Sequence, residues 1–325
     1  MAPVLSIANL RVSFPRMEAV RGVSLTLRGG ETHCLVGESG CGKSISALSV
    51  MNLLPRSAVR SADHIRFHEH DLLAMSERQM AWLRGDKIAM IFQEPMTSLN
   101  PAYTIGSQMA EVLERHRRAS RRQALDRAAE LLARVGITAP GMRLAQYPHQ
   151  LSGGLRQRMM IATALMCDPE VLIADEPTTA LDVTVQSQVL RLLRKLQQEM
   201  GLALLLITHD FGIVARMAEH VSVMYAGEVV ESGPVEQIIK APTHPYTRGL
   251  LNCIPVPGMT KPGEPLGSIP GGVPHIGRGF LGCGFRERCP MAARECAEPV
   301  HLHDAGEDHF YRCRLPPDWK LDASP

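Results

Sequence analysis

The sequence has no long apolar run. Its longest purely apolar stretch is LALLLI, residues 202–207, whereas a helix that crosses a bilayer needs about 20 apolar residues. The N-terminal residues MAPVLSIANLRVSF also lack the charged start, apolar segment and small-residue cleavage site of a secretion signal. We therefore expect an uncleaved cytosolic chain that does not cross a membrane by itself and in which disulfides are rare.

An excess of charge of one sign is absent as well. The 35 basic and 33 acidic residues leave a formal net charge of +2, so no overall electric field indicates binding to nucleic acid or to anionic lipid. Hydrophobic residues make up 45% and charged residues 21% of the 325 positions, which is typical of soluble globular proteins. A chain of this length can form one large domain with an appendage.

Cysteine is sparse in most of the chain. Cys34, Cys41, Cys167 and Cys253 are scattered, and we expect each of them to be a small buried apolar side chain. The other four cysteines fall within the last 43 positions, where the spacing calls for a separate explanation.

The apolar pattern predicts an α/β fold. Continuous apolar runs in PEVLIADEP (residues 169–177) and LALLLITHD (residues 202–210) are typical of parallel strands buried on both faces. Alternation in SIANLRVSF (residues 6–14) predicts a half-exposed strand. A further strand is predicted in DKIAMIFQE (residues 86–94).

Turn and helix signals complete this pattern. Residues 220–233 predict a hairpin that turns at Ala226 and Gly227. Helical spacing extends over about residues 105–165. The basic run at residues 115–122 is expected to be a solvated helix face.

A glycine-rich loop lies between a predicted strand and a predicted helix. Its sequence GESGCGKS matches G-x-x-x-x-G-K-[ST], and both flanking elements that this motif requires are present. Glycines let backbone N–H groups converge on phosphate oxygens, and the helix N-terminus adds partial positive charge. Lys43 would reach the β- and γ-phosphates of a nucleotide, and Ser44 would hold Mg²⁺. The candidate phosphate-binding residues are Gly37, Glu38, Ser39, Gly40, Cys41, Gly42, Lys43 and Ser44.

Two adjacent acids end the predicted strand VLIAD. Asp175 and Glu176 would be costly at the end of a buried strand unless they serve a cation or a proton transfer. We therefore expect Asp175 to hold Mg²⁺ through water and Glu176 to be the general base that polarises the attacking water.

A second helix N-terminus suited to anions begins at LSGGLRQR. Ser152, Gly153 and Gly154 precede a helical stretch, so their polar groups can face a phosphate. The motif lies 19 residues before the acid pair (Gln157 to Glu176), and this position turns a weak S-G-G match into a strong one.

With these motifs the chain resembles the nucleotide-binding subunits of ATP-binding-cassette (ABC) transporters. The resemblance covers about residues 4–250 and implies a P-loop NTPase fold of the α/β class. That fold has a RecA-like core, an antiparallel β subdomain and a helical subdomain at about residues 95–165. The nucleotide-binding domain would occupy residues 1–250. Further matching positions are Phe14, Gln93 in IFQEP, the loop Ala180 to Asp182, and His209 in ITHD.

The resemblance also implies roles for these positions. Phe14 would stack on adenine, and His209 would contact the γ-phosphate and orient the attacking water. Gln93 would bind Mg²⁺ and connect the γ-phosphate to a groove for a membrane subunit. ATP would be sandwiched between the phosphate loop of one subunit and residues 152–154 of its partner. Asp182 would act across that interface.

Three stretches resemble more closely the ATPases of dipeptide, oligopeptide and nickel importers. They are QEPMTSLNP (residues 93–101), HPYTRGLL (residues 244–251) and RCP within the cysteine-rich tail. This resemblance implies an enzyme that hydrolyses ATP to power uptake of dipeptides or oligopeptides. Import of nickel or metallophore chelates remains an alternative, because the substrate is selected by other subunits.

The implied partners are a paralogous ATPase in a heterodimer, two membrane permeases and a periplasmic or extracellular solute-binding protein, but no nucleic acid. The chain would lie at the cytoplasmic face of the inner or plasma membrane as a peripheral subunit. A non-transport ABC ATPase of translation or DNA repair is a weaker alternative. Only one cassette is present, and the 108 positions from Ser44 to Ser152 leave no room for a long coiled coil.

The tail, residues 251–325, is expected to be a loop-rich C-terminal metal-binding segment. It begins with a Pro- and Gly-rich linker at residues 254–277 and continues with cysteines spaced C-x₅-C-x₆-C-x₁₆-C. None of these gaps has the C-x₂₋₄-C spacing usual for zinc, whereas four thiolates, one of them followed by Pro290, suit a [4Fe–4S] cluster. The importer resemblance points to the same cluster, and the alternatives are zinc, free thiols or a redox disulfide. The candidate ligands are Cys283, Cys289, Cys296 and Cys313.

Overall fold

The computed structural model describes residues 2–93, 98–179, 181–254, 267–274, 277 and 279–319. They divide into two compact units. Unit 1 comprises Met1–Leu5, Thr26–Thr32 and Arg66–Ile207, and unit 2 comprises Ser6–Leu25, His33–Ile65 and Thr208–Pro325. The C-terminal tail therefore belongs to the same compact unit as the phosphate loop.

The centre of unit 1 is a parallel arrangement of β7 (Ile88–Ile91), β8 (Val171–Asp175) and β9 (Ala203–Thr208). In register, β8 pairs with β7 on one side and with β9 on the other. Every residue of β8 and β9 is buried, because apolar runs without alternation can be covered on both faces. The predicted buried parallel strands are confirmed.

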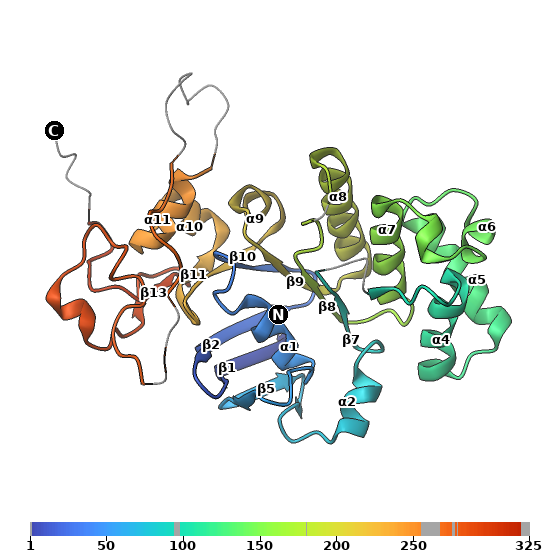
Figure 1. Cartoon of the computed structure of the whole chain (residues 1–325), viewed down its shortest axis with the longest axis horizontal. Coiled ribbons are helices and arrows are strands. Elements are labelled where there is room, and N and C mark those ends of the chain that lie inside the picture. Colours follow the sequence, from blue (N-terminus) through green and yellow to red (C-terminus); the bar gives the residue numbers. More distant parts are fainter. Residues whose placement is uncertain are drawn as a thin grey trace. The chain divides into compact units, whose positions relative to one another are not determined.

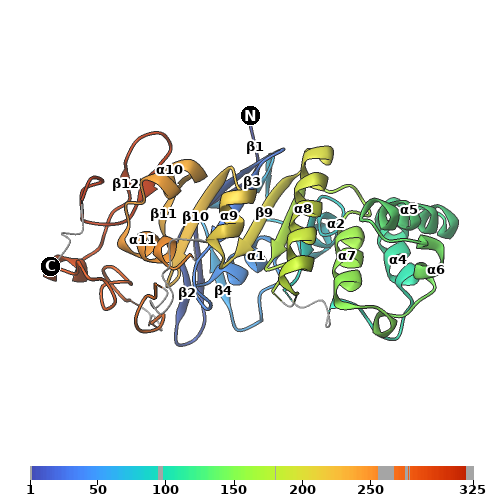
Figure 2. The same cartoon turned by 90° about the horizontal axis from the view of Figure 1, so that it is seen from above.

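Helices account for most of the remainder of unit 1. They include α2 (Glu77–Leu83), α4 (Ile105–Arg117), α5 (Arg121–Arg134), α6 (Pro140–Leu144), the 3₁₀ turn η1 (Pro148–Gln150), α7 (Gly153–Ala164) and α8 (Val183–Met200). Figure 2 shows α4, α5 and α6 gathered beside α7. The helical spacing predicted for residues 105–165 is confirmed.

Helix α5 illustrates how local sequence builds this region. Ser120 and Gln123 form a reciprocal capping box at its start. Its buried residues are Ala124, Ala128, Leu131 and Leu132, whose spacing places them on one face. The basic run at residues 115–122 is not a single helix face, since Arg118 has a left-handed φ of 53° and ends α4.

A first set of antiparallel strands lies near the start of the chain. They include β1 (Pro3–Ser13), β2 (Glu18–Arg28), β4 (Val59–Ser61), β5 (His64–Phe67) and β6 (His70–Asp71). Within unit 2, Arg11 of β1 pairs with Ser61 of β4 in antiparallel register. Within unit 1, Arg66 pairs with Asp71, also antiparallel. The strand predicted at residues 6–14 is confirmed up to Ser13, where β1 ends.

Unit 2 also contains a mixed set of paired strands (Figure 1). Strand β3 (Thr32–Val36) is parallel to β10 (His220–Tyr225), which forms an antiparallel hairpin with β11 (Glu228–Pro234). Its turn residues Ala226 and Gly227 have φ values of 46° and 87°, as a two-residue hairpin turn requires. The predicted hairpin is confirmed.

The tail adds short strands to this arrangement. Strand β13 (Phe310–Tyr311) pairs with β11 and with β12 (His303–Asp304). The helices described in unit 2 include α1 (Lys43–Val50), α9 (Phe211–Met217), α10 (Val235–Lys240), α11 (Pro245–Asn252) and the 3₁₀ turn η2 (Arg294–Ala297). The larger part of the predicted linker, residues 255–266 and 275–276, lies outside the described residues.

Side chains of the tail pack into unit 2. Phe285 and Trp319 are 2% and 7% exposed. The indole Nε1 of Trp319 donates to the carbonyl of Thr243 at 2.6 Å, and the Arg248 guanidinium lies 3.8 Å from the Trp319 ring centroid. The tail is therefore anchored by buried aromatic side chains as well as by β13.

Cys34, Cys41 and Cys167 are buried as predicted, whereas Cys253 is half-buried. Within the part of the chain that the structure describes, no helix combines the length and the apolar content that spanning a membrane would require.

Candidate functional site

The phosphate loop connects the end of β3 to the start of α1, as the sequence predicts. Gly42 has a φ of 104°, and a Cβ there would lie 2.5 Å from the carbonyl oxygen of Ala19. A Cβ on Gly37 would lie 2.1 Å from the carbonyl oxygen of Met224. Any larger residue at these two positions would displace backbone, so the loop conformation depends on both glycines.

Lys43 is the first residue of α1 and is 5% exposed. Its ammonium donates to the carbonyl oxygens of Gly37 at 2.7 Å and Glu38 at 2.9 Å. The loop thus curls around the Lys43 charge. Together with the positive end of the α1 dipole, this charge makes the loop suited to anions.

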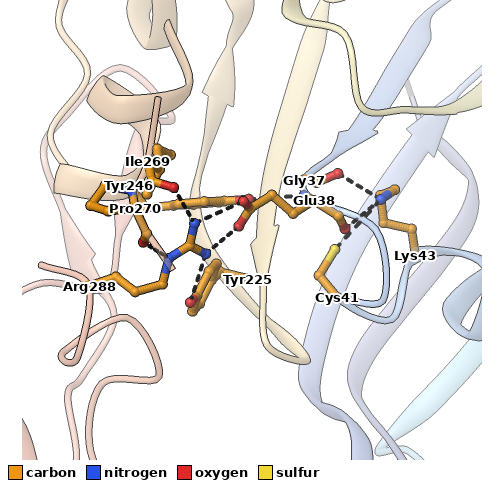
Figure 3. Close-up of polar contacts among 9 residues, drawn as sticks. All are labelled: Gly37, Glu38, Cys41, Lys43, Tyr225, Tyr246, Ile269, Pro270 and Arg288. Atoms are coloured by element: carbon orange, nitrogen blue, oxygen red, sulfur yellow. Dashed lines mark hydrogen bonds and ion pairs between the residues drawn. The ribbon is translucent and has the colours of Figure 1, made fainter. Parts of the chain in front are cut away.

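Glu38 is held from outside the loop, as Figure 3 shows. Its carboxylate accepts from Arg288 at 2.6 Å and 3.0 Å. Its backbone N–H donates to the Tyr246 hydroxyl at 2.9 Å. The hydrogen bonds to Glu38 hold the pKa of Arg288 above its ordinary value, and burial raises the pKa of Tyr246.

The acid pair follows β8. Asp175 is the last residue of that strand and is 4% exposed. Glu176 has a left-handed φ of 44°, which is uncommon for a residue with a side chain. Its backbone N–H donates to the carbonyl of Ile207 at 3.0 Å. The neighbouring strand β9 therefore fixes the backbone at this unusual position.

Polar side chains of unit 1 contact the Glu176 carboxylate. The Thr179 hydroxyl donates to Oε2 at 2.7 Å, and Gln93 Nε2 donates to the same oxygen at 3.3 Å. The structure thus brings Gln93, at the end of β7, to the predicted general base. Thr179 was not singled out from the sequence, although its place three residues after Glu176 could have indicated a hydroxyl within reach.

The signature residues start α7. Ser152 is the N-cap, and its hydroxyl accepts from the backbone N–H of Leu155 at 3.4 Å. Asp182 is the N-cap of α8 and accepts from the N–H of Val185 at 2.9 Å. A Cβ on Gly154 would lie 3.0 Å from Val185 Cγ1, so the signature packs closely against the start of α8. Ala180 and residues 94–97 of the stretch QEPMTSLNP lie outside the described residues.

The remaining predicted positions lie in unit 2. Phe14 follows β1, and its N–H donates to the carbonyl of Met17 at 2.8 Å in the turn before β2. His209 follows β9 and is exposed. Its neighbour Asp210 caps α9 by accepting from Gly212 N–H at 2.7 Å. Unit 2 therefore carries the phosphate loop, Phe14 and His209, and unit 1 carries the acid pair, Gln93 and the signature.

The four tail cysteines line one cavity of about 360 Å³. Its other lining residues include His244, Phe285, Met291, Val300 and Leu315. Burial, together with the thiols of Cys313, Cys296 and Cys289, raises the pKa of Cys283 to about 12. Burial also raises the pKa of Cys289 and Cys313. All four are free thiols.

The expected metal-binding tail is not supported as a preformed site. Among the residues described by the structure, no group of three or more His, Cys, Asp or Glu side chains is arranged to hold a metal ion. A structural zinc site needs four ligands at about 2.0–2.3 Å from one ion. The four cysteines line one cavity, but the described residues do not form such a group.

Two family models match this chain. Residues 20–179 match "ABC transporter", and residues 230–296 match "Oligopeptide/dipeptide transporter, C-terminal region". A putative peptide import ATP-binding protein of Brucella abortus (strain 2308) is 49% identical over 326 residues, which cover 96% of each chain. The dipeptide transport ATP-binding protein DppD of Bacillus subtilis (strain 168) is 49% identical over 301 residues, covering 91% of this chain and 90% of that protein.

Solved structures show the same fold. One is the ATP-binding cassette MJ0796 in a dimeric post-hydrolysis state bound to ADP and phosphate. It has a TM-score of 0.64 and 26% identity, and the match covers 71% of this chain and 98% of that chain. The cbiO1 structure from Clostridium perfringens, part of a cbiONQ transporter complex, has a TM-score of 0.64 and 26% identity over 73% of this chain and 91% of that chain. The predicted P-loop nucleotide-binding fold with mixed α and β elements is confirmed.

Proposed function

Because this chain belongs to the ABC transporter family, we propose that it is the ATP-hydrolysing subunit of a peptide importer. The observation that carries this proposal is the match of residues 230–296 to an oligopeptide/dipeptide transporter C-terminal region. The phosphate loop alone would indicate only the use of a nucleotide. The relatives reported above are named for peptides or dipeptides, which favours peptides over nickel or metallophore chelates.

The geometry within each unit supports a distinct role for its residues in ATP hydrolysis. The phosphate loop and Lys43 would bind the nucleotide phosphates. Glu176 would accept a proton from the water that attacks the γ-phosphorus, which breaks the bond to the β-phosphate oxygen and releases ADP and phosphate. The hydrogen bonds from Thr179 and Gln93 to Oε2 would hold the carboxylate in one orientation while it takes the proton.

The donor set also fits Mg²⁺. Ser44, Asp175 and Gln93 offer hydroxyl, carboxylate and amide oxygens, the hard ligands that this cation prefers. The ion would neutralise charge on the phosphates. His209 would contact the γ-phosphate, and Phe14 would stack on adenine. These roles, like the division of the chain at residue 250, remain predictions.

A dimer is part of the proposal. The signature begins α7, so its Ser152 hydroxyl and N-terminal amides are suited to a phosphate. A partner subunit, which we propose to be a paralogue, would place its signature over this chain's phosphate loop, and the reverse. Two permeases and a solute-binding protein would complete the importer, with this chain peripheral at the cytoplasmic face. The dimeric state of MJ0796 supports the dimer within this proposal.

We also propose a [4Fe–4S] cluster in the cysteine cavity. A cubane cluster binds one thiolate at each of four corners, so its ligands need not converge on one point. Cys283, Cys289, Cys296 and Cys313 line the same cavity, which fits such a group. Because burial raises the pKa values of three of these thiols, loading would release protons.

Peptide uptake is the first test. Cells that lack the gene are expected to lose uptake of labelled dipeptides or oligopeptides, and to regain it with the wild-type chain but not with Lys43→Ala. Nickel uptake should be the same in all strains. Restoration of nickel uptake without any effect on peptides would contradict the substrate class but not the ATPase assignment.

Metal content tests the cluster. The chain purified without oxygen is expected to carry about four irons and four sulfides, with the visible absorption of a thiolate-bound cluster. Cys289→Ser should lower both, because it removes one corner ligand. Cys253→Ser is the matched control, since Cys253 does not line the cavity. One zinc and no sulfide, or no metal at all, would refute the cluster.

A further inference from the structure

One residue of the phosphate loop is acidic. Glu38 is the only acid among residues 37–44, and its side chain is 31% exposed. A carboxylate beside a polyphosphate repels it unless the carboxylate is neutralised, since like charges at short range raise the free energy of the bound state. The loop therefore needs a compensating cation other than Lys43, which faces the loop carbonyls.

Arg288 provides that cation from the cysteine-rich tail, 250 positions later. It lies next to Cys289, and its side chain is 5% exposed. Two of its N–H groups form the bidentate pair with Glu38, the geometry in which arginine binds a carboxylate most strongly. In Figure 3 the Glu38 side chain extends toward Arg288, whereas Lys43 lies on the other side of the loop.

The rest of the guanidinium is also fixed. Nη1 donates to the Tyr225 hydroxyl at 3.2 Å, Nη2 to the carbonyl of Ile269 at 3.0 Å, and Nε to the carbonyl of Pro270 at 2.8 Å. With the two bonds to Glu38, all five N–H donors of arginine have an acceptor. The position therefore demands arginine, because lysine has no planar fork to make these bonds.

Tyr246 holds the backbone of the same glutamate. It is fully buried, and its hydroxyl accepts the Glu38 N–H at 2.9 Å. Its ring packs against those of Tyr225 and Phe285, with centroids 4.6 Å and 5.3 Å apart. The stretch HPYTRGLL, to which the sequence assigned no chemistry, thus contacts the phosphate loop directly.

We propose that Arg288 is a positioning residue of the ATP site, which neutralises Glu38 and keeps its carboxylate away from the bound phosphates. The inference rests on the proposed ATPase function. It makes the cysteine-rich tail a functional part of the phosphate loop. A purely structural ion pair would instead affect stability without a particular effect on the affinity for ATP.

A double-mutant cycle distinguishes a positioning role in ATP binding from a purely structural ion pair. Arg288→Gln is expected to raise the Kd and KM for ATP about tenfold, with kcat changed less than about twofold, because it leaves Glu38 uncompensated beside the phosphates. Glu38→Gln is expected to tighten ATP binding about two- to threefold, since it leaves Arg288 as an extra cation. The double variant should return to within about threefold of wild type.

The measurements use the full chain for Mg²⁺–ATP binding and the assembled transporter for kcat and KM. Arg288→Lys should fall between wild type and Arg288→Gln, because it restores the charge without the fork. Arg294→Gln, at an exposed position of the same tail, is the matched control and should match wild type. Thermal unfolding of each variant reports whether it is folded.

The outcomes are distinguishable. Equal weakening of ATP binding by Arg288→Gln and by the double variant would overturn the proposal, as would an unchanged Kd in folded Arg288→Gln. Should Arg288→Gln fail to fold, Glu38→Gln still decides, because weaker ATP binding in that variant contradicts charge compensation. A wild-type chain that binds no ATP would instead refute the proposed function itself.

Discussion

Glu176→Gln is expected to lower ATP turnover by about 10²–10⁴-fold, the usual contribution of a general base. Glutamine keeps the size of the side chain and its place beside Thr179 and Gln93, but its amide cannot accept the proton of the attacking water. ATP binding should be retained, because the phosphate loop and Lys43 belong to unit 2 and are unchanged. Turnover measured in the assembled transporter, with ATP binding measured separately, checks both expectations.

Two companion variants sharpen this test. Thr179→Val should lower turnover less than Glu176→Gln, because it removes a hydrogen bond that orients the base and leaves the base itself. Glu199→Gln replaces an acid on α8 that pairs with Arg134 at 2.9 Å and should leave turnover unchanged. Normal turnover by Glu176→Gln would contradict the assignment of Glu176 as the general base and would leave Gln93 and His209 as the candidates.

Glu231→Ala is expected to reduce the free energy of unfolding by about 3–5 kcal/mol, the typical cost of breaking a buried ionic group. Glu231 is fully buried in β11. It accepts from the backbone N–H groups of Thr243 at 2.6 Å and His244 at 3.0 Å, and it is 2.8 Å from His309 Nε2. Alanine would leave all three groups buried without their acceptor. The unfolding free energy in urea measures the effect.

Glu236→Ala is the matched control for this substitution. Glu236 lies one residue inside α10, its side chain is 78% exposed, and it pairs with Lys240 at 3.1 Å. Exposed pairs of this i,i+4 type contribute about 0.3–0.5 kcal/mol. If Glu231→Ala lowered the free energy of unfolding by as little as is expected for Glu236→Ala, the buried contacts of Glu231 would contribute little. Glu231 accepts from the N–H of His244 at the start of α11, and Tyr246 of the same helix accepts from the N–H of Glu38 in the phosphate loop. Glu231→Ala should therefore also weaken ATP binding.

Local patterns predicted the strands, the hairpin and the phosphate loop correctly. Each depends on neighbours in sequence: apolar runs for β8 and β9, glycines at positions 37 and 42, and two turn residues for the hairpin. The basic run at residues 115–122 was misassigned because charge alone does not reveal the left-handed Arg118 that ends α4. The φ of Arg118 depends on where α5 must begin, and the composition of the basic run does not contain this information.

The contacts that could not be predicted from the sequence join residues that are far apart along the chain. Arg288 and Glu38 are 250 residues apart, and no periodicity relates them. The same holds for Tyr246 and Glu38, which are 208 residues apart. The sequence identified the stretches HPYTRGLL and RCP as marks of the importer resemblance, but only the fold shows that they contact the phosphate loop. The motif-bearing residues were therefore predictable, and the residues that position them were not.

The contact between Glu38 and Arg288 also limits how such subunits can be recombined. Recognisable ATPase motifs end before residue 250, which makes that point a tempting junction for chimeras that exchange tails between paralogous subunits. A junction there would separate the glutamate of the loop from the arginine of the tail. A chimera should therefore inherit loop and tail from one parent, or keep an arginine at the position of Arg288. The phosphate loop and the cysteine-rich tail should be exchanged together, although more than 240 residues lie between Glu38 and Arg288.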